Sequence, residues 1–285
     1  MIVRNASNKE PLRVHDLNQI IVLLDRSETA LTEVGLNIWP AGIVGPPHAH
    51  TQKEQIFLIV SGTGSVVVGD KTFFVKPEDI VYVPPGMKHQ TIANSDSDLN
   101  YILVNAFLDL GKEGHGSFAE HIEKVKDERK AQAAGQADSG AAPVIDKAPL
   151  ATNLLKGGMT FDFGANLAVV LIDRSQTVKS EVVLVTWPVS FRGPMAVHHE
   201  KEQTFYVLSG AGMVTVNDET LPVSPGDVIH IPVSAPHTTE AGGQELRYVV
   251  FNIFVTDQRE GSFAQHAQRV APLRRARKGD FGIGV

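Results

Sequence analysis

The chain has 285 residues, a formal net charge of -6 and no cysteine. An acidic chain lacks the basic face that nucleic-acid binding requires, and without cysteine it has neither disulfides nor thiolate metal ligands. Hydrophobic residues make up 42%, as in a globular protein with a packed core, and because neither a signal peptide nor a run of ~18 apolar residues is visible, a cytoplasmic location without membrane contact is expected.

Short strands follow one another along the first half of the chain. Apolar, β-branched and aromatic runs end at glycine or proline turns, which is typical of a β-sandwich or β-barrel. No segment with helical periodicity lies between them. The expected strands are residues 55–60, 64–68, 72–75 and 80–83, and the last of them ends at Pro84-Pro85-Gly86.

A helix is expected after these strands. Ser117 is a suitable N-cap for residues 118–125, whose apolar side chains at 118, 122 and 125 have helical spacing. From about residue 127 to 150 the sequence is rich in alanine, glycine, glutamine, proline and charge. That composition predicts a flexible linker.

The second half of the chain repeats the first. Trp39 recurs as Trp187, an offset of 148 (187 − 39), and at that offset residues 39–89 match residues 187–237 at 21 of 51 positions without a gap. The chain is therefore a duplication of one domain, with a second helix capped by Ser262. We predict an N-terminal domain over residues 1–126, a linker over 127–150 and a C-terminal domain over 151–285.

Three histidines of the first half carry the predicted metal chemistry. His48 and His50 are two residues apart in a strand-like segment, so their side chains share one face. His89 follows the turn at residues 84–86, which can return the chain to that face. Three imidazoles that converge inside a small barrel favour a divalent transition metal, namely Fe, Mn, Ni, Co, Cu or Zn.

These residues lie in a spaced pattern that resembles the cupin superfamily. The family pattern is Gly-x5-His-x-His-x(3 or 4)-Glu-x6-Gly, followed by Gly-x5-Pro-x-Gly-x2-His. The chain has Gly42-x5-His48-x-His50-x4-Gln55-x6-Gly62 and then Pro84-x-Gly86-x2-His89, with Glu78 where the second motif opens on glycine. With two copies, the resemblance implies a bicupin, an all-β chain of two tandem double-stranded β-helix (jelly-roll) barrels, each followed by a short α-helix.

The fourth ligand departs from that pattern, because Gln55 stands where the family usually has a ligating glutamate. Gln55 is expected to bind the metal, or to hydrogen-bond a metal-bound water or the substrate. Strand alternation turns Glu54 to the other face, although a shift at the start of the strand would bring it in as the ligand. Tyr82 is expected either to contact substrate or to pack in the core, so Gln55, Glu54 and Tyr82 are the catalytic candidates. If Glu54 is not a ligand, Lys53 and Glu54 are expected to form a solvated ion pair on the surface.

The second copy offers a poorer metal site. At the offset of 148, Ala196 takes the place of His48, while His198, Gln203 and His237 match His50, Gln55 and His89. Two imidazoles and an amide bind a first-row metal only weakly. We therefore expect this barrel to support packing or to hold a ligand without metal.

Three functions remain open at this point. The first is a non-haem metal-dependent oxidoreductase of the dioxygenase type that acts on a small chelating organic substrate. The second is redox-free metal catalysis, meaning isomerisation, cyclisation or hydrolysis, and the third is a non-catalytic sugar or organic-acid binding protein. The expected partners are a small-molecule substrate and, in a homodimer, a second copy of the chain.

Overall fold

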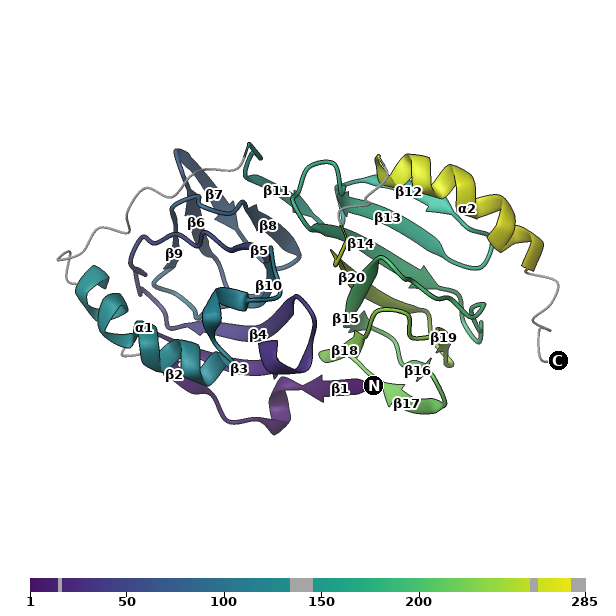
Figure 1. Ribbon diagram of the computed structural model, residues 1–285, viewed down its shortest axis with the longest axis horizontal. Helices are drawn as coiled ribbons and strands as arrows, with labels where there is room; N and C mark the ends of the chain where they lie inside the picture. Colours follow the sequence, from purple (N-terminus) through teal and green to yellow (C-terminus); the bar gives the residue numbers. More distant parts are fainter. Residues whose placement is uncertain (15–16, 134–145, 257–260, 278–285) are drawn as a thin grey trace. The chain divides into compact units, whose positions relative to one another are not determined.

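The computed structural model describes residues 1–14, 17–133, 146–256 and 261–277. The chain divides into two compact units (Figure 1). Ala6–Lys156 is called here the N-terminal barrel, and Met1–Asn5 together with Gly157–Val285 is called the C-terminal barrel. Each unit consists of antiparallel strands with few helices, which confirms the predicted all-β fold and its duplication.

The N-terminal barrel consists of two antiparallel sheets over a shared core. Its elements are η1 (Ala6–Asn8), β2 (Leu12–Val14), β3 (Asn18–Leu24), η2 (Arg26–Glu28), β4 (Thr32–Trp39), β5 (Lys53–Ser61), β6 (Gly64–Val68), β7 (Lys71–Val75), β8 (Asp79–Val83), β9 (His89–Ala93), β10 (Leu99–Phe107), η3 (Lys112–Gly114), α1 (Phe118–Ala133) and β11 (Leu150–Asn153). The larger sheet has the order β11-β8-β5-β10-β4-β3-β2, and the smaller has the order β7-β6-β9. Inward side chains of both sheets, among them Phe57, Val66 and Val81, form one buried cluster.

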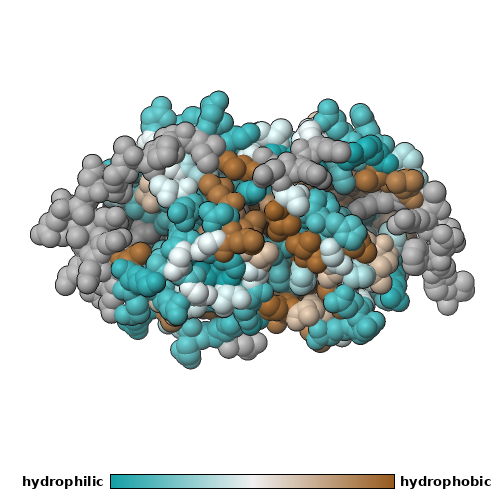
Figure 2. Space-filling model, viewed as in Figure 1, coloured by the Kyte–Doolittle hydropathy of each residue, from teal (hydrophilic) through white to brown (hydrophobic). Residues whose placement is uncertain are grey.

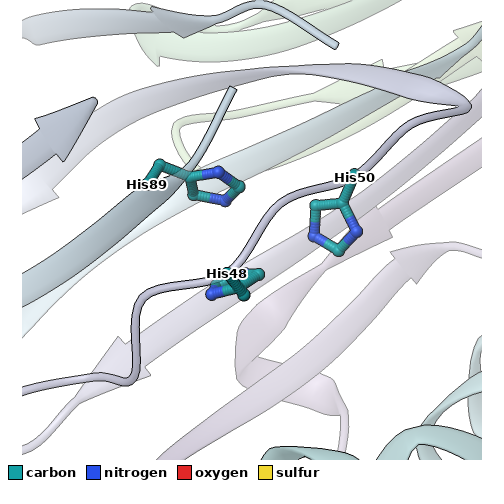
Figure 3. Close-up of side chains that lie close together, drawn as sticks. All are labelled: His48, His50 and His89. Atoms are coloured by element: carbon teal, nitrogen blue, oxygen red, sulfur yellow. The ribbon is translucent and has the colours of Figure 1, made fainter. Parts of the chain in front are cut away.

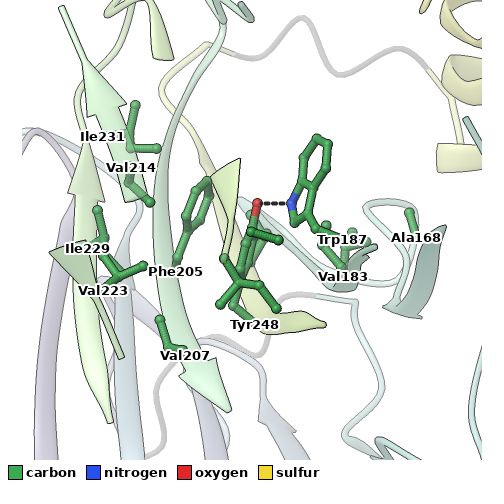
Figure 4. Packing of buried hydrophobic residues seen from close by; sticks show 14 of the residues in the cluster. Ala168, Val183, Trp187, Phe205, Val207, Val214, Val223, Ile229, Ile231 and Tyr248 are labelled. Atoms are coloured by element: carbon green, nitrogen blue, oxygen red, sulfur yellow. Dashed lines mark hydrogen bonds between the residues drawn. The ribbon is translucent and has the colours of Figure 1, made fainter. Parts of the chain in front are cut away.

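The C-terminal barrel has the same plan. Its elements are β1 (Ile2–Asn5), β12 (Met159–Asp162), β13 (Leu167–Ile172), β14 (Ser180–Trp187), β15 (Lys201–Ser209), β16 (Gly212–Val216), β17 (Glu219–Val223), β18 (Asp227–Ile231), β19 (His237–Ala241), β20 (Leu246–Phe254) and α2 (Phe263–Arg277). The sheets have the orders β1-β18-β15-β20-β14-β13-β12 and β17-β16-β19. At the core, the rings of Phe205 and Tyr248 stack 4.5 Å apart, and Trp187 Nε1 donates a hydrogen bond to Tyr248 Oη at 2.6 Å (Figure 4).

Each barrel takes an edge strand from the other half of the sequence. β1 pairs with β18, with Ile2 opposite His230, and β11 pairs with β8, with Leu150 opposite Tyr82. The compact units therefore differ from the domain limits predicted from sequence: residues 1–5 complete the C-terminal barrel, and residues 150–153 complete the N-terminal one. The pairing is a long-range contact that neither half of the sequence signals by itself.

Both helices begin at the serines predicted to cap them. Ser117 Oγ accepts a hydrogen bond from the backbone N–H of Glu120 at 3.2 Å, and Ser262 Oγ accepts one from Gln265 at 3.4 Å. Helix α1 continues beyond residue 125 to Ala133, into the segment predicted as a linker. The added residues are lysine, aspartate, glutamate, arginine, alanine and glutamine, most of which favour helix. Residues 134–145 of that linker lie outside the described residues.

Two turns of each barrel require a left-handed backbone. The turn before β9 has Gly86 at φ 76°, and its counterpart before β19 has Ser234 at φ 64°. The turn before β8 has Glu78 at φ 75°, and its counterpart before β18 has Gly226 at φ 88°. The first turn is tied to the histidine segment, because Gly86 N–H donates to the carbonyl oxygen of His50 at 2.6 Å.

The outer surface is mostly hydrophilic in the face shown in Figure 2, with apolar side chains exposed in smaller patches. The most exposed large apolar side chains are Phe74 at 84%, Leu110 at 74% and Leu155 at 70%. None of the helices in the described residues has the length and apolar character needed to cross a membrane.

Candidate metal centre

The structure brings His48, His50 and His89 together in the N-terminal barrel (Figure 3). The ring centroids of His48 and His89 are 4.3 Å apart, and His50 lies 5.1 Å from His48 and 5.5 Å from His89. One ring nitrogen of each histidine lies within 4.8 Å of the others. Three nitrogens bound about 2.1 Å from one ion lie roughly 3.0–3.6 Å apart, so the rings must move closer by about 1–2 Å for all three to bind one cation.

Backbone pairing explains why these histidines meet. The N–H of each of His48 and His89 donates to the carbonyl oxygen of the other, at 3.0 Å and 2.8 Å. This isolated antiparallel bridge fixes the segment before β5 against the start of β9. His50, two residues after His48, then lies on the same face because side chains alternate along an extended chain.

Hydrogen bonds to carbonyl oxygens set the tautomers of two of the rings. His48 Nδ1 lies 3.0 Å from the carbonyl oxygen of Pro46, and His89 Nδ1 lies 3.1 Å from that of Met87. A carbonyl oxygen can only accept, so each Nδ1 carries the proton and each Nε2 has the lone pair. Metal-binding histidines typically have this arrangement, because the second hydrogen bond fixes the ring orientation.

Gln55 is held beside the histidines by a chain of buried polar groups. Its Nε2 donates to Asn105 Oδ1 at 2.8 Å, and Asn105 Nδ2 donates to Glu33 Oε1 at 2.6 Å. Glu33 in turn accepts from the fully buried Arg26. This chain fixes the orientation of the Gln55 amide and leaves its carbonyl oxygen on the opposite side from Asn105.

The unsatisfied carbonyl oxygen of the Gln55 side chain shows whether this group of residues suits a metal ion. Gln55 is 5% exposed, and its Oε1 atom accepts no hydrogen bond within the described residues. A buried acceptor without a donor is costly, and a cation or a metal-bound water removes that cost. Three imidazoles and this amide oxygen therefore fit a divalent transition metal.

Glu113 is the main site residue that the sequence analysis missed. It lies in η3 with φ 64° and is partly buried. Its carboxylate lies 3.7 Å from His50 Nδ1, 3.1 Å from Lys53 Nζ and 3.5 Å from His121 Nδ1. No local motif marks it, because the loop after β10 brings it to the site. A carboxylate beside Nδ1 of a ligating histidine orients the ring and raises its basicity.

Lys53 is a buried cation at the edge of the site. Its side chain is 2% exposed, and burial lowers its pKa, while the Glu113 carboxylate opposes that effect. Lys53 lines a cavity of about 80 Å³ together with the three histidines, Gln55 and His121. The cavity is therefore lined by a candidate metal-binding set and by a buried lysine that is paired with Glu113.

Strand alternation separates two of the predicted catalytic residues from this cavity. Tyr82 and Glu54 are fully buried, and Tyr82 Oη donates to Glu54 at 2.7 Å. They lie on the faces of β8 and β5 opposite the inward side chains Val81, Val83 and Phe57. Neither lines the cavity, whereas Gln55 does. The prediction that Lys53 and Glu54 form a solvated surface pair is wrong, because both are buried in the central strand β5.

The C-terminal barrel repeats this arrangement with one histidine fewer. Ala196 forms the bridge to His237 that His48 forms to His89. The rings of His198 and His237 are 5.4 Å apart, and Gln203 donates to Asn252 at 2.7 Å just as Gln55 donates to Asn105. Among the described residues, only the N-terminal barrel gathers three metal-ligating side chains of histidine, aspartate or glutamate.

Comparison with protein families gives one match in each barrel. The model described as "Cupin domain" matches residues 36–105 and residues 183–254. The first matched range begins in β4, which ends at Trp39, and runs into β10, while the second begins in β14, which ends at Trp187, and runs to the end of β20. The three histidines and Gln55 of the N-terminal barrel, and their counterparts in the C-terminal barrel, therefore fall inside the matched ranges, whereas Glu113 and His121 lie outside them.

Solved structures with the same fold include the oxalate decarboxylase of Bacillus subtilis. One of these structures, from a study of the enzyme's Mn(II) centres, matches this chain with a TM-score of 0.63 and 15% identity, over 90% of this chain and 79% of that chain. Its structure at pH 4.6 is matched with a TM-score of 0.62 and 16% identity, over 90% of this chain and 78% of that one. At this identity the likeness concerns the fold alone.

A curated relative is an uncharacterised protein of Methanocaldococcus jannaschii, MJ1618. It is 33% identical over 63 residues, which are 22% of this chain and 50% of that protein. The match thus spans about half the length of the relative, and its name assigns no activity.

Proposed function

The chain belongs to the cupin family, with one cupin domain in each half, and from this we propose that it is a metal-dependent enzyme of the dioxygenase type. The N-terminal barrel is the active site, and the substrate is a small organic chelator. The observation that carries the proposal is the convergence of three imidazoles on one cavity, which is also lined by Gln55, a residue whose buried amide oxygen has no hydrogen-bond donor among the described residues.

The charges around the site favour an anionic substrate. The proposed ligands are three neutral imidazoles and a neutral amide. The buried cations nearby, Arg26 and Lys53, are balanced by the carboxylates of Glu33 and Glu113. A divalent ion bound here keeps its full charge, so it lowers the pKa of bound water and favours negatively charged oxygen ligands.

The chain's own residues supply orientation and charge. Lys53 lines the cavity, so its Nζ can donate a hydrogen bond to a carboxylate or enolate oxygen of the substrate while it stays paired with Glu113. The Gln55 amide is fixed by Asn105 and therefore holds one ligand position without adding negative charge. Glu113 contacts His50, Lys53 and His121, so it holds a proposed metal ligand, a hydrogen-bond donor and a titratable imidazole in one arrangement.

The size of the cavity limits the substrate. At about 80 Å³ it holds on the order of five to eight non-hydrogen atoms, since one water-sized probe takes up roughly 10–15 Å³. Hydroxy acids, dicarboxylates and small enediols have that size. Oxalate, the substrate named for the similar Bacillus subtilis structures, therefore belongs in the set of compounds to be tested.

The test is metal analysis followed by oxygen-uptake measurements. Protein purified without added metal is expected to contain about one equivalent of a redox-active divalent metal per chain. Oxygen uptake is then measured with a panel of small chelators, using His89→Ala as the inactive control. Purification free of metal, with no metal taken up on titration, would contradict the proposal and support a non-catalytic binding protein.

Redox-free metal catalysis is the second candidate, and one observation favours it. Lys53, Glu113 and His121 form a cluster of titratable groups at the cavity, and isomerisation or hydrolysis needs such groups to move protons. Substrate turnover with bound zinc and without oxygen uptake would favour this candidate. Turnover that requires oxygen would favour the first.

A further inference from the structure

The C-terminal barrel contains a second cavity, lined by the counterparts of the residues that line the metal centre. Its volume is about 360 Å³, against about 80 Å³ in the N-terminal barrel. His198, Gln203 and His237 line it, but Ala196 stands in place of the third imidazole. This cavity therefore has one imidazole fewer and is several times larger.

Aliphatic side chains replace larger or polar ones on the walls of this cavity. Ile20 and Asn37 are cross-strand partners that line the N-terminal cavity, and at the same register the C-terminal cavity has Ala168 and Val185 (Figure 4 labels Ala168). Asn37 donates a hydrogen bond to Tyr101 at 3.1 Å, whereas the side chain of Val185 has no polar atom. The walls have therefore gained apolar space.

Three apolar side chains lie where the cavity opens to solvent. Met195, Val197 and Leu273 line the cavity and are also exposed, Leu273 to 62%. They are called here the apolar mouth. Met195 and Val197 come from the segment before β15, and Leu273 comes from α2. A ligand that extends from the cavity therefore meets aliphatic groups from two segments.

The N-terminal barrel has smaller or charged residues at the corresponding sequence positions. At the offset of 148, Pro47 and Ala49 correspond to the first two members of the apolar mouth. At the offset of 145, which relates the first residues of α1 and α2 (263 − 118), Glu128 corresponds to Leu273. The apolar mouth is thus a property of the second half of the sequence.

A buried lysine lines the same cavity. Lys201 is 4% exposed. Its Nζ lies 3.9 Å from Oε1 of Glu200, a side chain that is 33% exposed and lies equally close, at 3.8 Å, to His198. In the N-terminal barrel, Lys53 Nζ lies 3.1 Å from the more buried Glu113. The ion pair of Lys201 is therefore longer and closer to water, so an anion in the cavity gains a favourable contact with this buried cation.

We propose that the C-terminal barrel binds an aliphatic monocarboxylate with a chain of about eight carbons, without a metal ion. The carboxylate accepts a hydrogen bond from Nζ of Lys201, and the chain extends along the aliphatic walls to the apolar mouth. A second carboxylate at the far end of the chain would lie against apolar groups, which favours one charge over two. Octanoate, with about ten non-hydrogen atoms, fits the volume because one water-sized probe takes up roughly 10–15 Å³.

Titration calorimetry of the full-length chain tests the two ends of the ligand separately. One equivalent of octanoate is expected to bind per chain. Butanoate keeps the carboxylate and is expected to bind roughly 100-fold more weakly, because each buried methylene group strengthens binding about fourfold. The alcohol 1-octanol keeps the chain and is expected to bind at least about tenfold more weakly than octanoate. No binding of octanoate, or equal affinity for either of the other two compounds, would overturn the proposal.

Leu273→Glu tests the apolar mouth. The variant introduces the residue that the N-terminal half has at the corresponding position, and its exposed site leaves folding unaffected. Octanoate is expected to bind at least about tenfold more weakly. Leu155→Glu, the same change at another exposed leucine, is the control and is expected to bind octanoate as the wild type does. Unchanged affinity in Leu273→Glu overturns the proposal.

Lys201→Met tests the charged end of the site. Octanoate is expected to bind this variant about as weakly as 1-octanol binds the wild type, while the affinity for 1-octanol stays the same. Lys53→Met, the same change in the N-terminal barrel, is expected to leave octanoate binding unchanged. Loss of binding in Lys53→Met, with binding kept in Lys201→Met, would place the carboxylate in the other barrel and overturn the proposal. If Lys201→Met does not fold, the result for Leu273→Glu decides.

The absence of metal from the proposed site is tested by chelation. The affinity for octanoate is measured before and after treatment of the full-length chain with EDTA and desalting. The two values are expected to agree, because two imidazoles and an amide bind a first-row metal only weakly. Loss of octanoate binding on chelation, with recovery when Mn²⁺ is added back, would show that a metal holds the carboxylate and would overturn the proposal.

Discussion

The Nδ1 atom of His50 lies 3.7 Å from Oε1 of Glu113, a residue that follows strand β10 and is 63 positions later in the sequence. The same carboxylate contacts Lys53 and His121. A single acidic side chain thus contacts one of the three clustered imidazoles and pairs with a buried lysine. The first prediction concerns this contact.

Glu113→Gln is expected to weaken metal binding by about 10–100-fold, the range found when a partner of a metal-bound histidine is removed. The measurement is a competition titration of Mn²⁺ with a chelating indicator. Glu10→Gln, at an exposed position, removes the same charge away from the site and is the control. Equal metal affinities in the two variants would show that Glu113 does not position His50.

The two barrels are expected to respond differently to loss of a histidine. His89→Ala removes one of three imidazoles and is expected to lower the retained metal to less than about a tenth of the wild-type content. His237→Ala, the same change in the C-terminal barrel, is expected to leave the metal content unchanged. Elemental analysis of desalted protein measures both, and equal losses would refute the asymmetry between the barrels.

Gln55→Glu places a carboxylate in the proposed set of ligands. We expect metal binding to tighten by roughly tenfold or more, equivalent to about 1.4 kcal/mol, because the ion gains a charged ligand. Binding of a small anionic chelator to the loaded protein should weaken for the same reason. Glu54→Gln, one residue earlier and on the opposite face of β5, is expected to change neither affinity.

The left-handed turns give a prediction about stability. Glu78 has φ 75°, where its counterpart is Gly226. A side chain in this conformation costs about 1–2 kcal/mol, whereas the greater conformational entropy that glycine loses on folding costs about 0.5–1 kcal/mol. Glu78→Gly is therefore expected to stabilise the protein by up to about 1 kcal/mol. Gly226→Ala is expected to destabilise it. Urea unfolding measures both, with Gly243→Ala, which meets no atom within 4 Å, as the control.

The fold and the histidine cluster follow from local sequence rules. Alternation places His48 and His50 on one face, the turn at Gly86 returns His89, and the repeat transfers the same plan to the second barrel. The orientation of Gln55 rather than Glu54 toward the cavity also follows from alternation in β5. These relations depend on spacings of a few residues, which a sequence displays directly.

The rest of the site depends on contacts between segments far apart in the sequence. Glu113 reaches His50 through the conformation of η3, and no motif encodes that approach. Lys53 is buried because β5 lies between β8 and β10 in the sheet. Adjacent charged residues such as Lys53 and Glu54 suggest an exposed position when the order of the strands is unknown. This is why the prediction of a solvated surface pair was wrong.

The place of β1 bears on how the molecule is made. Residues 2–5 are synthesised more than 200 residues before their partner strand β18 (Asp227–Ile231). A nascent chain must therefore carry an unpaired edge strand through almost the whole of its synthesis, and such edges are prone to pair with other chains. Cutting the gene in the middle would leave the second fragment without that strand, so separately expressed halves are expected to aggregate unless residues 1–5 are supplied to the latter half.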